Sequence, residues 1–170
     1  PLLSDKDPSK VNLASRFAKP SPQHVLGTDE MGRDVLARLL YGGRVSLMVG
    51  LSAMCIAMLL GTLTGALAGY GGGWLDSILM RFTDAMLSFP LFFFMLTILA
   101  LIGSELYKIV LVIAAASWMT VARVVRAEAL RTRSLDFVVA ARAIGGSDAH
   151  IIMRHVIPQS VPSIIVAATL

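Results

Sequence analysis

The chain of 170 residues is far more apolar than a soluble domain of its size, with 56% hydrophobic and 15% charged residues and a mean hydropathy of +0.74. Its formal charge of +4 does not indicate a nucleic-acid partner, because residues 45–75 and 85–104 carry no charged side chain. A helix of about 20 apolar residues crosses the hydrocarbon core of a bilayer. The composition therefore predicts an all-α, polytopic bundle of membrane-spanning helices and argues against an ordinary soluble enzyme or DNA-binding domain.

Residues 1–44 are expected outside the membrane, and the first 26 of them are polar and contain four of the seven prolines, which predicts an extended loop there. After this loop, residues 30–41 place apolar and charged side chains on opposite helical faces. We expect an amphipathic helix there, lying on the membrane surface or against the end of the bundle. Thr28 or Asp29 is the expected N-cap.

Three carboxylates near this helix, at Asp29, Glu30 and Asp34, allow two interpretations. One is a metal site, but no histidine, cysteine or complete calcium-loop pattern accompanies them. The other, which we favour, is helix capping combined with ion pairs to Arg33 and Arg38.

The first spanning helix is expected over residues 45–70. Gly61, Gly65 and Gly69 recur every four residues near its end, so they lie on one face of the helix. Small residues in this register let a neighbouring helix approach closely. The spacing predicts a helix-packing face.

The second spanning helix is expected over residues 74–102, with Pro90 kinking it because proline removes a backbone hydrogen bond. Arg81 and Asp84 lie three residues apart and are expected to pair. Ionisable groups near a bilayer are candidates for a translocation path. An interfacial ion pair is the alternative, and the sequence does not choose between the two.

A third span is expected over residues 106–122, and its helix continues in water to about residue 133. A fourth apolar run, residues 156–170, is too short to cross a bilayer, so we expect a truncated span and a chain that is a fragment. The polar loop between them, residues 123–155, carries six arginines. By the positive-inside rule this loop is expected in the cytoplasm and residues 1–44 outside. The three arginines within residues 33–44 oppose this orientation, but six outweigh three.

Residues 136–158 are expected to form two short helices around a turn. Asp136 is the expected cap of the first, Gly145 and Gly146 end it, and Ser147 or Asp148 caps the second. Pro158 is expected to break the chain before the next apolar run. In a soluble protein a helix-turn-helix would suggest DNA binding, but this one lies between membrane segments.

Chemical motifs point away from catalysis. The chain contains no phosphate-binding loop of the Gly-x-x-x-x-Gly-Lys type and no Gly-x-Ser-x-Gly elbow. His150 and His155 are five residues apart, a spacing that does not place them on one face of an α-helix as metal ligands. We therefore expect no catalytic residue and no metal site.

The segment Val-Ala-Ala-Arg-Ala-Ile-Gly at residues 139–145, followed by Val-Ile-Pro at 156–158, resembles the cytoplasmic "EAA" loop of ABC-importer permeases. Ala140, Ala141, Gly145 and Pro158 match its spacing, whereas Val139 replaces the glutamate. Residues 24–47, 76–84 and 88–90 are similar to the C-type permease subunit of the dipeptide, oligopeptide and nickel importers.

This resemblance implies a six-helix permease subunit in a bacterial or archaeal cell (inner) membrane, of which the chain holds about four spans. The implied partners are a second permease subunit, two cytoplasmic ATPase subunits and an external solute-binding protein. The chain itself would bind no cofactor, since the ATPase subunits use the ATP. Residues expected to couple to the ATPase are Phe137, Val139, Ala140, Ala141, Arg142, Ile144, Gly145, Asp148, Ile151, Arg154 and Pro158.

The resemblance leaves the solute open between dipeptides, oligopeptides, glutathione and nickel chelates. A channel or exporter component that needs no binding protein is the alternative from another functional class.

Overall fold

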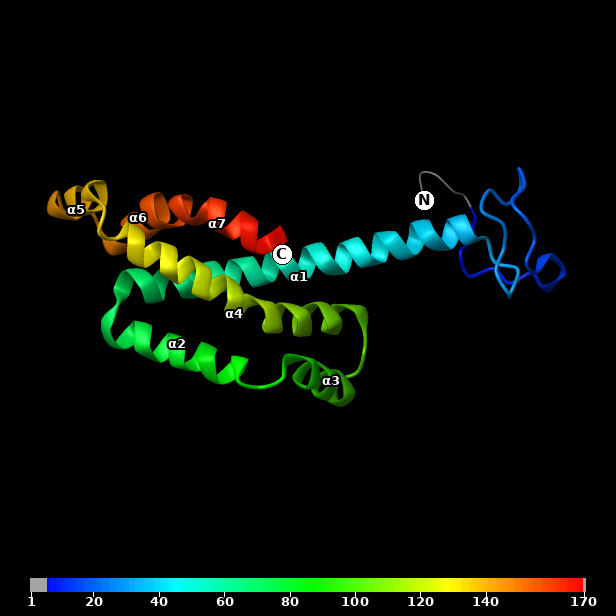
Figure 1. The fold of residues 1–170 in the computed structure, drawn as a ribbon, viewed down its shortest axis with the longest axis horizontal. Coiled ribbons are helices and arrows are strands. Elements are labelled where there is room, and N and C mark those ends of the chain that lie inside the picture. Colours follow the sequence, from blue (N-terminus) through cyan, green and yellow to red (C-terminus); the bar gives the residue numbers. More distant parts are fainter. Residues whose placement is uncertain (1–5, 170) are drawn as a thin grey trace. The chain divides into compact units, whose positions relative to one another are not determined.

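The computed structural model describes residues 6–169, and this part of the chain is helical without a β-strand. The chain divides into two compact units, residues 1–50 and 51–170. The helical elements in chain order, coloured along the sequence in Figure 1, are η1 (Leu13–Ser15), α1 (Val35–Gly71), α2 (Gly73–Leu87), α3 (Leu91–Ile102), α4 (Leu106–Thr132), α5 (Asp136–Ala143), α6 (Asp148–Ile151), the π-helical η2 (Ile152–Val156) and α7 (Ile157–Thr169).

The N-terminal unit is a loop segment that leads into α1. The Thr28 hydroxyl oxygen accepts a hydrogen bond from the Ala18 N–H at 2.8 Å, and Thr28 forms an isolated antiparallel bridge with Asp34. Asp34 is 6% exposed, and its carboxylate accepts the Ala37 N–H at 3.0 Å, the bond of a helix cap. The expected amphipathic helix therefore begins at Val35 rather than near Glu30, and Asp34 caps it instead of Thr28 or Asp29.

No break separates this amphipathic stretch from the first expected span, because α1 runs without interruption from Val35 to Gly71. Gly42 and Gly43 lie between the two predicted helices but remain helical. A glycine inside a helix costs only about 0.5–1 kcal/mol relative to alanine, so two of them do not end a helix that is stabilised on both sides.

The carboxylates of Asp29 and Asp34 are held by cationic and backbone donors. The Arg33 Nε–H donates to Asp29 Oδ2 at 2.8 Å, Arg38 also pairs with Asp29, and Lys6 Nζ lies 2.8 Å from Asp34 Oδ2. Burial acts to raise the pKa of the Asp34 carboxyl, but hydrogen bonds from Lys6, the Ala37 N–H and His24 hold the pKa well below its usual range. The pKa of Asp29 is lowered in the same manner, against the effect of burial, chiefly by the backbone N–H of Arg33.

Acid is expected to loosen this segment. Because the pKa of Asp34 is lower in the folded segment than in an unfolded chain, its stabilisation is complete above the ordinary carboxylate pKa of about 4 and is lost as the pH falls further. We expect hydrogen exchange in residues 28–37, corrected for its intrinsic pH dependence, to accelerate below about pH 4. Asp34→Asn should exchange faster at pH 7 and keep only a smaller acid transition, from Asp29. An unchanged transition in this variant would contradict the role of Asp34.

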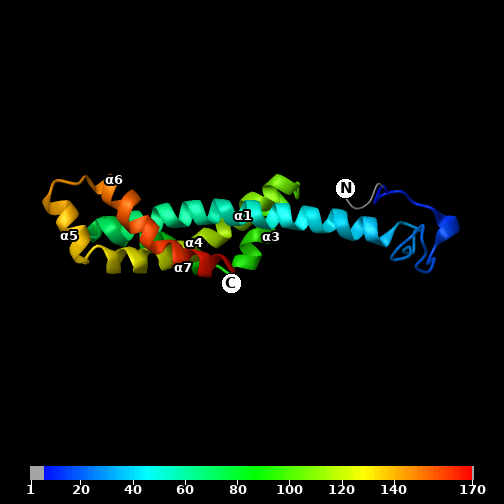
Figure 2. The ribbon, with the colours of Figure 1, turned by 90° about the horizontal axis from the view of Figure 1, so that it is seen from above.

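In the C-terminal unit the second half of α1, α4 and α7 lie side by side (Figures 1 and 2). The three glycines expected to form a packing face contact α4. A Cβ atom added at Gly61, Gly65 or Gly69 would lie 2.6, 2.4 and 2.6 Å from the backbone oxygens of Trp118, Ala122 and Arg126, respectively. Contacts this close are possible only where the side chain is a hydrogen atom.

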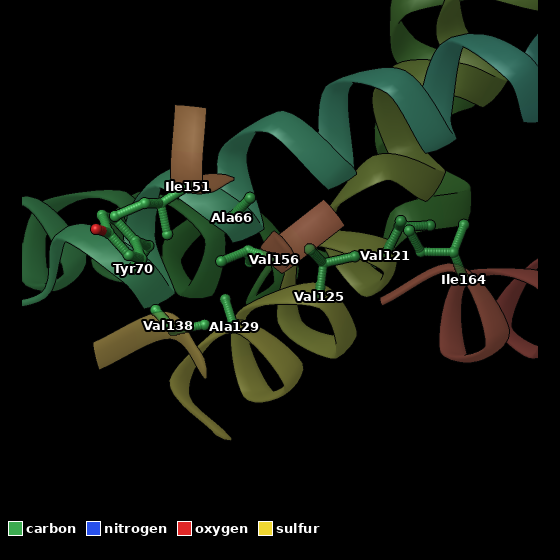
Figure 3. Packing of buried hydrophobic residues seen from close by; sticks show 9 residues of the cluster. All are labelled: Ala66, Tyr70, Val121, Val125, Ala129, Val138, Ile151, Val156 and Ile164. Carbon is green, nitrogen blue, oxygen red and sulfur yellow. The ribbon is translucent and has the colours of Figure 1, made fainter. Parts of the chain in front are cut away.

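Buried residues from α1, α4, α5, α6, η2 and α7 form one core cluster where the C-terminal end of α1 meets the 136–158 segment (Figure 3). It unites the spanning helices with the short helices of residues 136–158. Its buried members are Ala66, Tyr70, Val121, Val125, Ala129, Val138, Ile151, Val156 and Ile164.

Within residues 6–169, two helices are long and apolar enough to cross a membrane, α1 and α4, and α2 with α3 would make a third span if the bent pair is counted together. The two helices of that pair meet at 82°, with Pro90 as the N-cap of α3. The expected kink at Pro90 is thus a complete interruption of the helix. The fourth apolar run is the 13-residue α7.

Candidate coupling surface and its links to the spanning helices

The turn between α5 and α6 is built by Gly145 and Gly146. Gly145 has a φ of +88°, and its N–H donates to the Arg142 carbonyl at 3.0 Å, while the Gly146 N–H donates to the Ala141 carbonyl at 2.9 Å. These two bonds form a Schellman motif, which ends α5 as expected. The Ser147 hydroxyl accepts the His150 N–H at 3.3 Å and caps α6, whereas Asp136 lies inside the first turn of α5 rather than capping it.

Pro158 does not break the chain. The helix continues from α6 through the π-helical η2 into α7, and the Ile157 N–H donates to the Ile152 carbonyl five residues earlier. Proline lacks an N–H and crowds the preceding turn, and a local widening of the helix relieves this conflict. The wider turn also brings the rings of His150 and His155, five residues apart, to a centroid distance of 6.3 Å.

The segment 136–158 has an inner and an outer face. Val138 and Ile151 are 1% and 0% exposed and belong to the core cluster. Ile151, which we expected to be available to a partner, therefore packs within its own chain. On the outer face Phe137, Val139 and Ile144 are exposed, and Ile144 reaches 88%. Ala141 is half-buried, and the remaining predicted coupling residues are also exposed: Ala140, Arg142, Gly145, Asp148, Arg154 and Pro158.

Tyr70, at the end of α1, contacts this segment and was not predicted from the sequence. Its hydroxyl donates to Asp148 Oδ1 at 2.9 Å, and the Arg142 guanidinium lies 5.1 Å from the centre of its ring. The pKa of Arg142 is raised, first by the Tyr70 hydroxyl and more weakly by Asp148. No sequence signal marks Tyr70, since Asp148 lies 78 residues further along the chain.

A second link joins α2 to α4 through two ion pairs. Asp76 accepts two hydrogen bonds from the Arg126 guanidinium, the one from Nη2 measuring 2.6 Å, and Asp84 Oδ1 lies 2.5 Å from Arg123 Nη2. The expected partner of Asp84 was Arg81, three residues earlier. Asp84 pairs instead with Arg123 because α2 packs on α4, and Arg81 forms no ion pair within residues 6–169.

Long apolar helices joined to a short amphipathic helix pair define the chain as a helical integral membrane protein. Residues 61–170 match the family model described as binding-protein-dependent transport system inner membrane component. Because this match covers more than half of the chain, the chain belongs to that family. The description is of a transport component, which agrees with the sequence-based expectation that the chain is not an enzyme.

Curated relatives match over all 170 residues, and three of them illustrate the similarity. The dipeptide transport system permease protein DppC of Alkalihalophilus pseudofirmus is 38% identical, and its namesake in Bacillus subtilis is 35% identical. The oligopeptide transport system permease protein OppC of Bacillus subtilis is 30% identical. The chain spans just over half the length of these relatives, 56%, 53% and 56% respectively.

Proposed function

We propose that the chain is part of a permease subunit of an ATP-binding-cassette importer, and that its spanning helices line the path of a peptide. The outer face of α5 and the following turn supports this proposal most directly. Ile144 is 88% exposed beside a turn that a Schellman motif fixes. A large apolar side chain held in water on a rigid support is typical of a residue that enters a partner's pocket.

The partner proposed for this face is the ATPase subunit, which places residues 123–155 in the cytoplasm and residues 1–44 outside. ATP binding would draw two ATPase subunits together, and the 136–158 segment would move with them as a rigid element. A second permease subunit and an external solute-binding protein complete the proposed assembly.

Val139 makes the proposed contact with the ATPase apolar at a position where the importer loop pattern is acidic. It is 55% exposed at the place where the importer loop pattern has a glutamate. Phe137 and Ile144 are the other large exposed apolar residues of this short segment, so the surface that the ATPase would meet carries three apolar side chains and the exposed Arg142. We propose that the ATPase meets it with an apolar groove rather than with a cation.

Peptides are the proposed solutes because the relatives are named for dipeptide and oligopeptide transport. Nickel chelates and glutathione are the alternatives, and a channel or exporter would function without a binding protein. Uptake by proteoliposomes that contain the complete transporter tests these possibilities together. Labelled peptide should enter only when ATP and the binding protein are both present, and uptake without the binding protein would contradict the proposal.

Ile144→Asp is expected to weaken docking of the ATPase without affecting insertion of the permease, because the side chain makes no buried contact in its own chain. We expect the amount of ATPase that co-purifies with the permease to fall by about tenfold. Val11→Asp is the matched control, since it adds the same charge at an apolar residue that is 52% exposed within residues 1–44. Equal ATPase recovery with both variants would contradict a docking role for Ile144.

A further inference from the structure

We propose that Tyr70 is the positioning residue through which the 136–158 segment moves the end of α1. This role rests on the proposed function and goes beyond it, because it assigns the transmission step to one side chain. Tyr70 is 5% exposed and is the only polar member of the core cluster in the described part of the chain. Figure 3 shows its ring beside Val138 and Ile151, the two buried anchors of α5 and α6.

Two contacts of different chemistry join Tyr70 to the two short helices. The hydrogen bond to Asp148, at 2.9 Å, connects it to the first residue of α6. The guanidinium of Arg142, 5.1 Å from the ring centre, connects it to the last turn of α5. Both interactions weaken steeply with distance. A displacement of α5 and α6 together therefore either carries Tyr70 along or breaks both contacts.

The position of Tyr70 along α1 determines what such a displacement would move. One residue earlier, Gly69 is packed on α4, and the Arg133 Nη1 donates to the Gly69 carbonyl at 3.2 Å. Two residues later, Gly72 and Gly73 have φ values of +62° and +55° and form the turn into α2. Tyr70 thus lies between a fixed contact and a turn of low steric resistance. A pull on Tyr70 would bend this turn and change the angle between α1 and α2, because Asp76 holds the start of α2 to Arg126 of α4.

The space beside the contact between α1 and the α5–α6 pair is not filled by side chains of residues 6–169. A pocket of about 490 Å³, open to solvent, is lined by Tyr70, Gly71, Arg133, Ser134, Arg142 and Asp148. If close-packed side chains filled this space, they would resist a change in the angle between α1 and the α5–α6 pair, because such packing is hardly compressible. Where this pocket lies, α1 is connected to α5 and α6 by the polar contacts of Tyr70 and not by close packing.

The test measures ATP hydrolysed per peptide imported by the complete transporter in proteoliposomes, supplied with its binding protein. Tyr70→Phe removes the hydroxyl and keeps the ring, and Asp148→Ala removes the acceptor. We expect each variant to raise this ratio by about two- to tenfold, the effect of losing one hydrogen bond. Because both remove the same bond, the double variant should be no worse than the more affected single variant.

Asp148→Asn keeps an acceptor oxygen and should restore most of the coupling, which separates the hydrogen bond from the charge of Asp148. Tyr107→Phe is the matched control, since Tyr107 is 62% exposed at the start of α4. A ratio in Tyr70→Phe equal to that of the unchanged protein would overturn the role of Tyr70. This includes the case in which hydrolysis and uptake fall by the same factor. If the unchanged transporter imported no peptide with ATP, the proposed function itself would fail, and this role with it.

Discussion

Replacing Gly65 by leucine is expected to disrupt the packing of α1 on α4 and to lower the free energy of unfolding of the permease strongly. Even a single Cβ atom at this position would lie 2.4 Å from the Ala122 carbonyl oxygen and 2.9 Å from the Val125 Cβ. A leucine adds three more carbon atoms, and the Ala122 carbonyl oxygen cannot move away from them because its position is fixed by the backbone of α4. Overpacking of a core usually costs about 1–3 kcal/mol, and we expect Gly65→Leu to reach or exceed the upper end of that range.

The measurement is the free energy of unfolding in mixed micelles, followed by circular dichroism as the denaturing detergent is increased. Gly65→Ala should lie between the two proteins, although alanine favours the helical backbone more than glycine does. Gly50→Leu is the matched control, because an added Cβ there meets nothing within 4 Å among the described residues beyond its own stretch of helix. It is expected to be neutral or slightly stabilising. If Gly65→Leu and Gly50→Leu unfolded alike, the close contact with α4 would not be what makes Gly65 necessary.

The difference between these two glycines also shows which features of the fold can be predicted from the sequence alone. A repeat of three glycines at intervals of four residues is local, and it predicts a packing face without any knowledge of the partner. The partner helix, α4, begins 37 residues after Gly69. The turn at Gly145 was likewise predictable, because a Schellman motif depends only on a glycine at the end of a helix.

Contacts between distant segments could not be predicted in this way. The sequence paired Asp84 with the nearest suitable cation, Arg81, whereas helix packing brings Arg123 to it. The helix that continues past Pro158 was missed because proline usually marks a helix end, and only the conformation of η2 reveals that a π-turn has absorbed it. Tyr70 is only the last residue of the first span that the sequence predicts, and nothing nearby in the sequence distinguishes it. Its function depends on Asp148 and Arg142, whose positions follow from the fold of the 136–158 segment.

Asp76→Ala is expected to destabilise the packing of α2 on α4 more than any other removal of a single charge in the C-terminal unit. Asp76 is 16% exposed and receives two hydrogen bonds from Arg126, which is 34% exposed. Removing the carboxylate leaves the guanidinium partly buried without its counter-ion. A fully buried pair loses about 3–5 kcal/mol on such a change, and we expect about 2–3 kcal/mol here because Arg126 retains some contact with solvent.

The same detergent titration measures this loss, and the matched control is Arg131→Ala. Arg131 pairs with Glu128 within α4 but is more than half exposed, so its removal should change the free energy of unfolding little. Exchanging both residues, Asp76→Arg with Arg126→Asp, should recover part of the stability, since the pair is re-formed in reverse. Because Asp76 lies in the first turn of α2, directly after the glycine turn that follows Tyr70, its loss should also separate movement of α2 from movement of α4. An Asp76→Ala protein as stable as the Arg131→Ala protein would mean that apolar packing alone holds α2 in place.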